Sequence, residues 1–295
     1  MQAIVFYLIY PFIYLVASLP LPVLYKVSDV LYHLMRLSGY RKGVILTNLR
    51  NSFPEKSEAE IQQLCANYQR YMVDLILETL KTLTTTEKEA RELCTLDTPV
   101  WMNELFEKKK SVIVVMGHYG NWEWAGPSFT LNTKHQLVVI YRPLTHPYFD
   151  KMMVGMRTKF GTRITPVQQT LRDMVANRNQ VTATTFIADQ TAFPENAYWM
   201  KFLNQDTAVF GGPEKLAKKF DYPVVFLNIS RPRRGHYIID LELMFEHPRE
   251  TAENEITDAF MRRLERQIIA EPTLWLWSHR RWKYTKPVEN GSPAS

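Results

Sequence analysis

The pattern of apolar and polar positions changes at about residue 111 and divides the chain into two parts. Before this point apolar residues recur every three or four positions, as they do on one face of a helix. This pattern predicts helices over 41–54, 57–83 and 86–107. Beyond it, short β-branched runs alternate with helical stretches, which predicts an α/β fold with a largely parallel central sheet flanked by helices.

The expected elements of the second part follow one another regularly. Apolar and β-branched runs predict strands over 112–116, 137–141, 181–188, 223–228 and 237–245, and the last of these is open to an antiparallel placement. Periodic stretches predict helices over 121–131, 146–160, 168–178, 212–220 and 253–269. We therefore expect four parts: an N-terminal membrane anchor at 1–25, a helical part at 26–110, an α/β core at 111–289 and a disordered tail at 290–295.

The first 25 residues contain no charged side chain, and Lys26 is the first to appear. A membrane-spanning helix needs about 20 apolar residues, and this segment just reaches that length. Pro11 and three tyrosines suit a kinked helix held in the membrane interface equally well. A buried N-terminal helix of a soluble protein is the third alternative. The basic residues that follow, with only Asp29 opposing them, predict a cytoplasmic location for the rest of the chain.

Composition and charge exclude few classes of binding partner. The formal charge of +6 and the pI near 9.1 suit an anionic membrane surface or an acidic substrate. The chain has neither zinc-finger spacing nor an aromatic RNA-binding signature, so nucleic acid is not an expected partner. Cys65 and Cys94 have no paired spacing, which indicates two ordinary thiols in a reducing compartment.

The strongest chemical signal follows the strand at 112–116, where His118 lies between Gly117 and Gly120. Glu123 comes five residues later, just inside the helix expected to begin near Asn121. Positions five apart on one helix are about 140° out of phase, so the two side chains can meet only if His118 precedes the helix. An imidazole held by a carboxylate is a general base. The alternative is a structural histidine.

Polar residues also follow two other expected strands, Arg142 after 137–141 and Asp189 after 181–188. The carboxyl ends of parallel strands share one edge of a sheet, where ligands bind. His118, Arg142 and Asp189 are therefore expected along the same edge. From its position we expect Asp189 to be structural, pairing with an arginine, rather than a second base.

His-x4-Glu after a strand resembles the His-x4-Asp/Glu motif of the glycerolipid and lipid A acyltransferases. The other blocks resemble the lipid A biosynthesis late acyltransferases (lauroyl/myristoyl transferases) over nearly the whole length. The similar blocks are Asn48-Leu49 with Ser52-Phe53-Pro54, Tyr141-Arg142-Pro143 with Arg157 and Gly161, Ala188-Asp189-Gln190, Gly212-Pro213 with Pro223-Val224-Val225, and Trp277-Ser278-His279-Arg280-Arg281-Trp282-Lys283. The chain departs from that family at Phe202-Leu203-Asn204 and within the motif at 119–122.

This resemblance implies acyl transfer from a thioester, acyl carrier protein or coenzyme A, to a hydroxyl of a membrane lipid. The lipid is expected to be a lipid A precursor or a related bacterial lipid, at the cytoplasmic face of the bacterial inner membrane. His118 is the expected general base and Glu123 the expected partner of its second ring nitrogen. No metal and no other cofactor is expected.

Other residues are candidates for substrate binding. The amides at Gly120 and Asn121, or Arg142, are candidate donors to the oxyanion. Arg142 and Arg157 are candidates for binding a substrate phosphate, since a guanidinium group can form two parallel hydrogen bonds to a phosphate. The aromatic and basic cluster around Arg280 allows three interpretations: a core-capping strand, an interfacial patch or a substrate clamp.

Three alternatives remain for the function. The chain can be an acyltransferase for a lysophospholipid or an aminolipid, a lipid-binding protein without turnover, or a hydrolase in which the histidine activates water. The His118/Glu123 motif disfavours the non-catalytic alternative. A Gly-x-Ser-x-Gly nucleophile is absent from the sequence, which disfavours a serine hydrolase.

Overall fold

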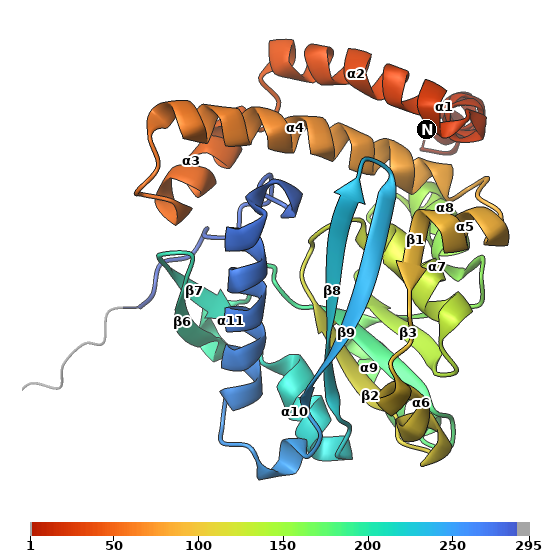
Figure 1. The fold of residues 1–295 in the computed structure, drawn as a ribbon, viewed down its shortest axis with the longest axis vertical. Coiled ribbons are helices and arrows are strands. Elements are labelled where there is room, and N and C mark those ends of the chain that lie inside the picture. The colour runs from red at the N-terminus through yellow and green to blue at the C-terminus, as the bar shows by residue number, and fades with distance from the viewer. Residues whose placement is uncertain (1, 288–295) are drawn as a thin grey trace, which may run out of the picture.

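The fold is α/β and is built on a seven-stranded sheet that is mostly parallel (Figure 1). The computed structural model describes residues 2–287, so the tail expected at 290–295 lies outside the described residues. The strand order is β1 (Cys94–Leu96), β9 (His236–Phe245), β8 (Val224–Arg233), β2 (Val112–Met116), β5 (Thr182–Ile187), β3 (Gln136–Tyr141) and β4 (Arg163–Pro166). Within this sheet β8 and β9 pair antiparallel and the other neighbours pair parallel. The predicted sheet flanked by helices is confirmed.

Helices cover both faces of this sheet, and β2 shows how the sequence specifies it. All five of its residues are buried, Ile113 and Val115 in one core and Val112, Val114 and Met116 in the other. The first core lies under α3 (Lys42–Ser52), α4 (Glu58–Lys81), α9 (Thr170–Ala176), α10 (Gly212–Phe220) and α11 (Glu255–Ala270). The second lies under α5 (Glu87–Leu93), α6 (Val100–Glu107) and α7 (Trp122–Asn132). An uninterrupted apolar strand is therefore buried on both sides.

Three short features differ from the prediction. The helix expected over 86–107 is divided into α5 and α6 by β1, which pairs with β9 at the sheet edge and buries Cys94 and Leu96. Strand β4 and a separate hairpin of β6 (Tyr198–Phe202) and β7 (Gln205–Val209) were not predicted. The hairpin turns at Leu203 and Asn204, which both have positive φ. The turn therefore lacks the glycine by which such hairpins are usually recognised in a sequence.

Helix α4 crosses one end of the sheet and connects the N-terminal helices to it (Figure 1). It begins with the capping box predicted from Ser57 and Glu60, in which each residue hydrogen bonds the backbone N–H of the other. One side of α4 packs against α2, and another contacts the segment after α11. The helix therefore lies between the N-terminal helices and the strand ends that carry the candidate site.

The N-terminal segment forms two helices, α1 (Gln2–Ser18) and α2 (Leu21–Ser38), separated at Pro20. No helix of the described residues is both long enough and apolar enough to cross a membrane. Among the residues of α1 only Phe6 and Ala17 are buried, and Phe6 packs against Tyr148 and Phe149 of α8 (Pro147–Thr158). The outer side of α1 is apolar and exposed.

Candidate active site

His118 and Asp189 face each other across two neighbouring strands. In the parallel register Met116 of β2 lies opposite Ile187 of β5, so His118 and Asp189 each follow their strand by two residues. Nδ1 of the His118 ring lies 2.6 Å from Oδ1 of Asp189, and the backbone N–H of His118 donates to Oδ2 at 2.9 Å. The shared strand edge thus produces a tightly held imidazole and carboxylate pair.

Gly117 makes this approach possible. A β-carbon at this position would lie 2.6 Å from Cδ1 of Leu264 in α11 and 3.2 Å from Oδ2 of Asp189. Both distances are below ordinary van der Waals contact for a methyl carbon. A glycine therefore allows the turn to pack directly between the helix and the carboxylate.

Asp189 is fully enclosed and has a third donor, Trp275 Nε1, at 2.8 Å from Oδ2. Burial by itself raises the pKa of Asp189, but the nearby His118 and the hydrogen bonds from His118 and Trp275 outweigh it and leave the pKa below its usual value. Asp189 is therefore held as a carboxylate. An ionised Asp189 accepts at both oxygens, which favours the His118 tautomer that carries its hydrogen on Nδ1.

The other ring nitrogen of His118 faces outward. Nε2 lies 3.2 Å from Nε2 of Gln190, and the His118 side chain keeps 16% of its surface exposed. Trp122 packs against the ring edge to face at 5.1 Å between ring centroids. With Nδ1 bound to Asp189, Nε2 is free to exchange a proton with a ligand on the open side.

Gln190, which contacts Nε2 of His118, also lines a cavity of about 480 Å³ together with four cationic side chains. Those cations are Arg41, Arg142, Arg280 and Lys283. None of them forms an ion pair within residues 2–287, and no acidic side chain lines the cavity. An uncompensated cluster of this kind attracts an anionic ligand.

Glu123 does not contact His118, and this differs from the sequence prediction. Its Oε2 and Oε1 accept hydrogen bonds from Nε and Nη2 of Arg157 in α8, at 2.9 and 2.6 Å. Because Glu123 lies in the first turn of α7, its side chain reaches sideways to α8 and not back to the preceding turn. The carboxylate on the second ring nitrogen of His118 is that of Asp189, and Asp189 pairs with a histidine where an arginine was expected.

Gly120 and Asn121, whose backbone amides were candidate donors to the oxyanion, do not form an open pair of donors in the structure. The N–H of Gly120 donates to the carbonyl of Leu274 at 3.0 Å. Asn121 is fully buried, and its side chain points to Glu78 and caps α7 at Trp124. The side chain of Asn121 therefore does not line the cationic cavity.

The C-terminal segment hydrogen bonds both the turn that carries His118 and helix α3. Leu276 N–H donates to the carbonyl of His118, and Asn48 of α3 donates to the carbonyls of Trp277 and His279 at 2.8 and 3.0 Å. Two motif blocks that are 229 residues apart in sequence are thus joined by one side chain. The described residues contain no group of three or more His, Cys, Asp or Glu side chains that is placed to hold a metal ion.

The chain matches the family described as bacterial lipid A biosynthesis acyltransferase over residues 1–284. The chain belongs to this acyltransferase family. Comparison with curated proteins gives no match. The family covers almost the whole chain, which confirms the resemblance inferred from the ordered motif blocks and establishes acyl transfer as the class of reaction.

The structure of this lipid A acyltransferase family member brings together residues that sequence reasoning treated separately. Arg142 and Arg280 both line the cavity that Gln190 connects to His118, as candidate binding residues should. Arg157 is instead occupied by Glu123. Arg41, Gln190 and Lys283 were not predicted as site residues. Gln190 and Lys283 lie inside motif blocks that were recognised, but Arg41 lies outside any block and has no signal of its own in the sequence.

Proposed function

We propose that the protein transfers a fatty acyl chain from a thioester to a hydroxyl of a lipid A precursor or a related phosphorylated bacterial lipid. The observation that carries this proposal is that Gln190 connects the His118–Asp189 pair to a cavity lined by four cations that form no ion pair within residues 2–287. The pair supplies a base for a hydroxyl. The cations supply a place for phosphate groups, which guanidinium and ammonium groups bind well.

In the proposed reaction Nε2 of His118 removes the proton of the acceptor hydroxyl while its oxygen attacks the thioester carbonyl. The tetrahedral intermediate then collapses, the carbon–sulfur bond breaks, and the proton on Nε2 passes to the leaving thiolate. Asp189 stabilises the imidazolium between these two steps through Nδ1. Protons and electrons balance without a metal or another cofactor, and acyl carrier protein or coenzyme A supplies the thioester.

The oxyanion of this intermediate needs donors. The Gly120 amide is occupied by Leu274 and Asn121 is fully buried, so we assign this role to the amide of Trp122, which has no acceptor within residues 2–287. This amide opens α7, where unpaired N–H groups and the helix dipole favour negative charge. The ion pair of Glu123 with Arg157 supports it by tying the first turn of α7 to α8.

The proposal is tested by giving the purified protein an acyl thioester and a phosphorylated lipid A precursor and following the lipid by mass spectrometry. The mass should rise by one acyl chain, and the lipids of a host lacking the gene should lose the same chain. Acylation of a lysophospholipid or an aminolipid in place of the precursor would reassign the acceptor. Release of free fatty acid with no acylated lipid would support the hydrolase alternative.

The four cations make a quantitative prediction about binding. Arg142→Ala and Arg280→Ala should each raise the KM for the phosphorylated acceptor about 10- to 100-fold, as expected for the loss of a charge-assisted contact of about 1.5–3 kcal/mol, with a smaller change in kcat. Arg50→Ala, which removes an arginine paired with Glu58 on the surface, is the matched control. An unchanged KM in both cavity variants would contradict phosphate binding here.

We propose that the N-terminal helices lie on the cytoplasmic surface of the inner membrane. The supporting observation is the exposed apolar face of α1, where Ile4, Leu8, Phe12 and Leu15 are each more than 60% exposed at helical spacing. An apolar helical face of this kind inserts into the headgroup boundary of a bilayer. Basic residues after it suit anionic lipid headgroups.

A double substitution tests this placement. Leu8→Asp/Phe12→Asp should reduce cosedimentation with anionic phospholipid vesicles at least tenfold, because two charges must then enter the apolar boundary. Val100→Asp/Ile269→Asp changes two exposed apolar residues on α6 and α11 and should leave vesicle binding unchanged. Equal binding by both double variants would argue against α1 as the membrane contact.

A further inference from the structure

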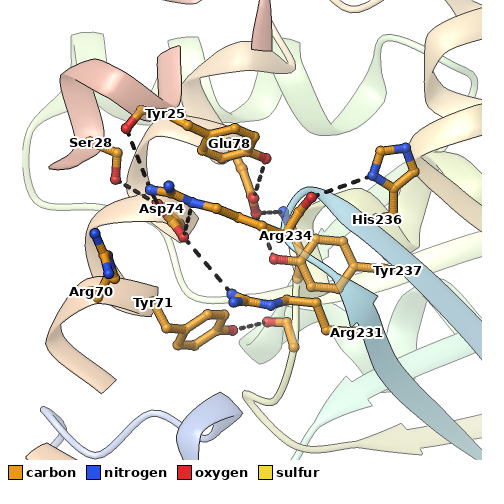
Figure 2. Close-up of polar contacts among 12 residues, drawn as sticks. Tyr25, Ser28, Arg70, Tyr71, Asp74, Glu78, Arg231, Arg234, His236 and Tyr237 are labelled. Carbon is orange, nitrogen blue, oxygen red and sulfur yellow. Dashed lines mark hydrogen bonds and ion pairs between the residues drawn. The ribbon is translucent and has the colours of Figure 1, made fainter. Parts of the chain in front are cut away.

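A buried carboxylate on α4, Glu78, lies beside the hydroxyl groups of Tyr25 and Tyr237 (Figure 2) and contacts Asn121, three residues after His118. Its side chain is 0% exposed and accepts three hydrogen bonds. Tyr25 donates to Oε1 at 2.7 Å, and Tyr237 and Asn121 donate to Oε2 at 2.7 and 2.9 Å. These donors come from α2, β9 and the start of α7, so Glu78 is a common acceptor for three separate elements.

Among residues 2–287 no cation hydrogen bonds Glu78. The nearby Arg234 donates instead to Asp74, one turn earlier on α4, at 2.6 and 2.9 Å (Figure 2). Burial raises the pKa of Glu78, and the hydrogen bonds from its neutral partners oppose that shift. A carboxylate is costly in such a place. Unlike a side-chain amide, the Glu78 carboxylate can accept hydrogen bonds at both of its terminal atoms.

Two hydrogen bonds fix the orientation of the Asn121 side chain. The NH2 group of Asn121 donates to Oε2 of Glu78 at 2.9 Å. Its Oδ1 then faces the other way and accepts the backbone N–H of Trp124 at 2.9 Å, which is the N-cap of α7. Glu78 and the N–H of Trp124 thus hold the same orientation of Asn121, with its oxygen capping the helix.

Helix α4 holds the same turn at two further points. Tyr71 donates to the carbonyl of Gly120 at 2.5 Å, and the indole N–H of Trp124 donates to the carbonyl of Glu78 at 2.9 Å. A trans peptide is planar, so fixing the Gly120 carbonyl directs the N–H of Asn121 to the opposite side. The backbone from Gly120 to Trp124 is therefore set by contacts from α4.

We propose that Glu78 is a positioning residue for acyl transfer, acting through Asn121, with Tyr71 acting beside it on the Gly120 peptide. Together they position the Trp122 amide, which opens α7, to face the oxyanion. This inference rests on the proposed function, since that amide matters only if a tetrahedral intermediate forms beside His118. Because an oxyanion exists only during the reaction, disturbing the network should lower kcat and leave KM nearly unchanged.

The first test is Asn121→Asp. The new side chain can still cap α7, but it places a second carboxylate against Glu78, and two carboxylates at this distance repel unless one takes a proton. We expect kcat to fall about 100-fold, as for a misplacement of about 1 Å, and KM to change less than about threefold. Tyr71→Phe, which keeps the ring and removes the donor to Gly120, should also lower kcat, by about tenfold or more.

The decisive test exchanges the carboxylate and the amide between positions 78 and 121. In Glu78→Gln/Asn121→Asp the amide of the glutamine can donate to the new carboxylate, so kcat should recover to within about tenfold of wild type, where rescue reflects the restored hydrogen bond. Asp74→Asn is the matched control, a buried acid of the same helix and network without contact to the turn. It should lower the melting temperature and retain kcat.

Three outcomes would overturn the positioning role. They are wild-type kcat in folded Asn121→Asp, failure of the double variant to recover, and an equal loss of kcat in Asp74→Asn. All variants are assayed below their melting temperatures, so that loss of fold is not scored as loss of rate. If wild-type protein itself transfers no acyl chain, the proposed function falls and this inference falls with it. An active wild type with an unaffected Asn121→Asp variant removes this inference alone.

Discussion

Replacing His118 by alanine should lower acyl transfer at least about 1000-fold, within the range of about 100- to 10,000-fold that a positioned general base contributes. The fold should survive, because the backbone N–H of residue 118 can still donate to Asp189 and its carbonyl can still accept from Leu276. The measurement is the initial rate with saturating thioester and lipid, together with circular dichroism and melting temperature. His33→Ala, which removes an exposed histidine of α2, should have wild-type rate.

A second measurement separates proton transfer from structure. The His118→Ala variant leaves space beside the open cavity, so added imidazole should restore part of the rate in a concentration-dependent manner. Restoration should increase with pH as more of the imidazole is neutral, since only that form accepts a proton. A folded variant that keeps more than about a tenth of the wild-type rate would be incompatible with His118 as the base.

The sequence was sufficient to locate five strands of the sheet because these strands carry strong local signals. The run at 112–116 is apolar without interruption, and β2 occupies those residues with both faces buried. The run at 237–245 likewise became β9, which pairs antiparallel with β8. β1 could not be predicted in the same way, because three residues gain strand geometry only through their pairing with β9.

The candidate site was predicted in part, and what was missed depends on register. That His118 and Asp189 lie at one edge of the sheet followed from the expectation that their strands run parallel. Their direct contact depends on β2 and β5 being neighbours with Met116 opposite Ile187, which no local pattern encodes. Sequence spacing favoured Glu123 as the partner because it is closer along the chain. The competing interaction with Arg157 comes from α8, 34 residues further on.

The other features that the sequence did not predict depend on contacts between residues far apart in the chain. Glu78 appeared in the sequence as one polar position of a long amphipathic helix, and its three donors come from α2, α7 and β9. The buried acid is informative only once those elements are assembled, since exposed and buried glutamates look alike in a helical pattern. Arg41 enters the cationic cavity in the same way, through the packing of separate segments.

Replacing Asp189 by asparagine should lower kcat by about 1000- to 10,000-fold, as expected when a catalytic histidine is held in the wrong tautomer. Oδ2 of Asp189 accepts from the His118 N–H and from Trp275, so the amide oxygen of asparagine must take that place. Its NH2 group then faces Nδ1 of His118, which must accept. The ring hydrogen moves to Nε2, and the nitrogen that should take the substrate proton is already occupied.

The tautomer and the pH dependence of stability distinguish this account from a simple loss of structure. Nitrogen NMR of His118 should show hydrogen on Nδ1 in wild type and in Glu123→Gln, and on Nε2 in Asp189→Asn. Because the pKa of Asp189 is lowered in the folded protein, its stabilisation is present at neutral pH and is lost as pH falls through that lowered pKa. The difference in unfolding free energy between wild type and Asp189→Asn should therefore narrow in acid. An Nδ1 tautomer lost in Glu123→Gln but kept in Asp189→Asn would show instead that Glu123 orients the base.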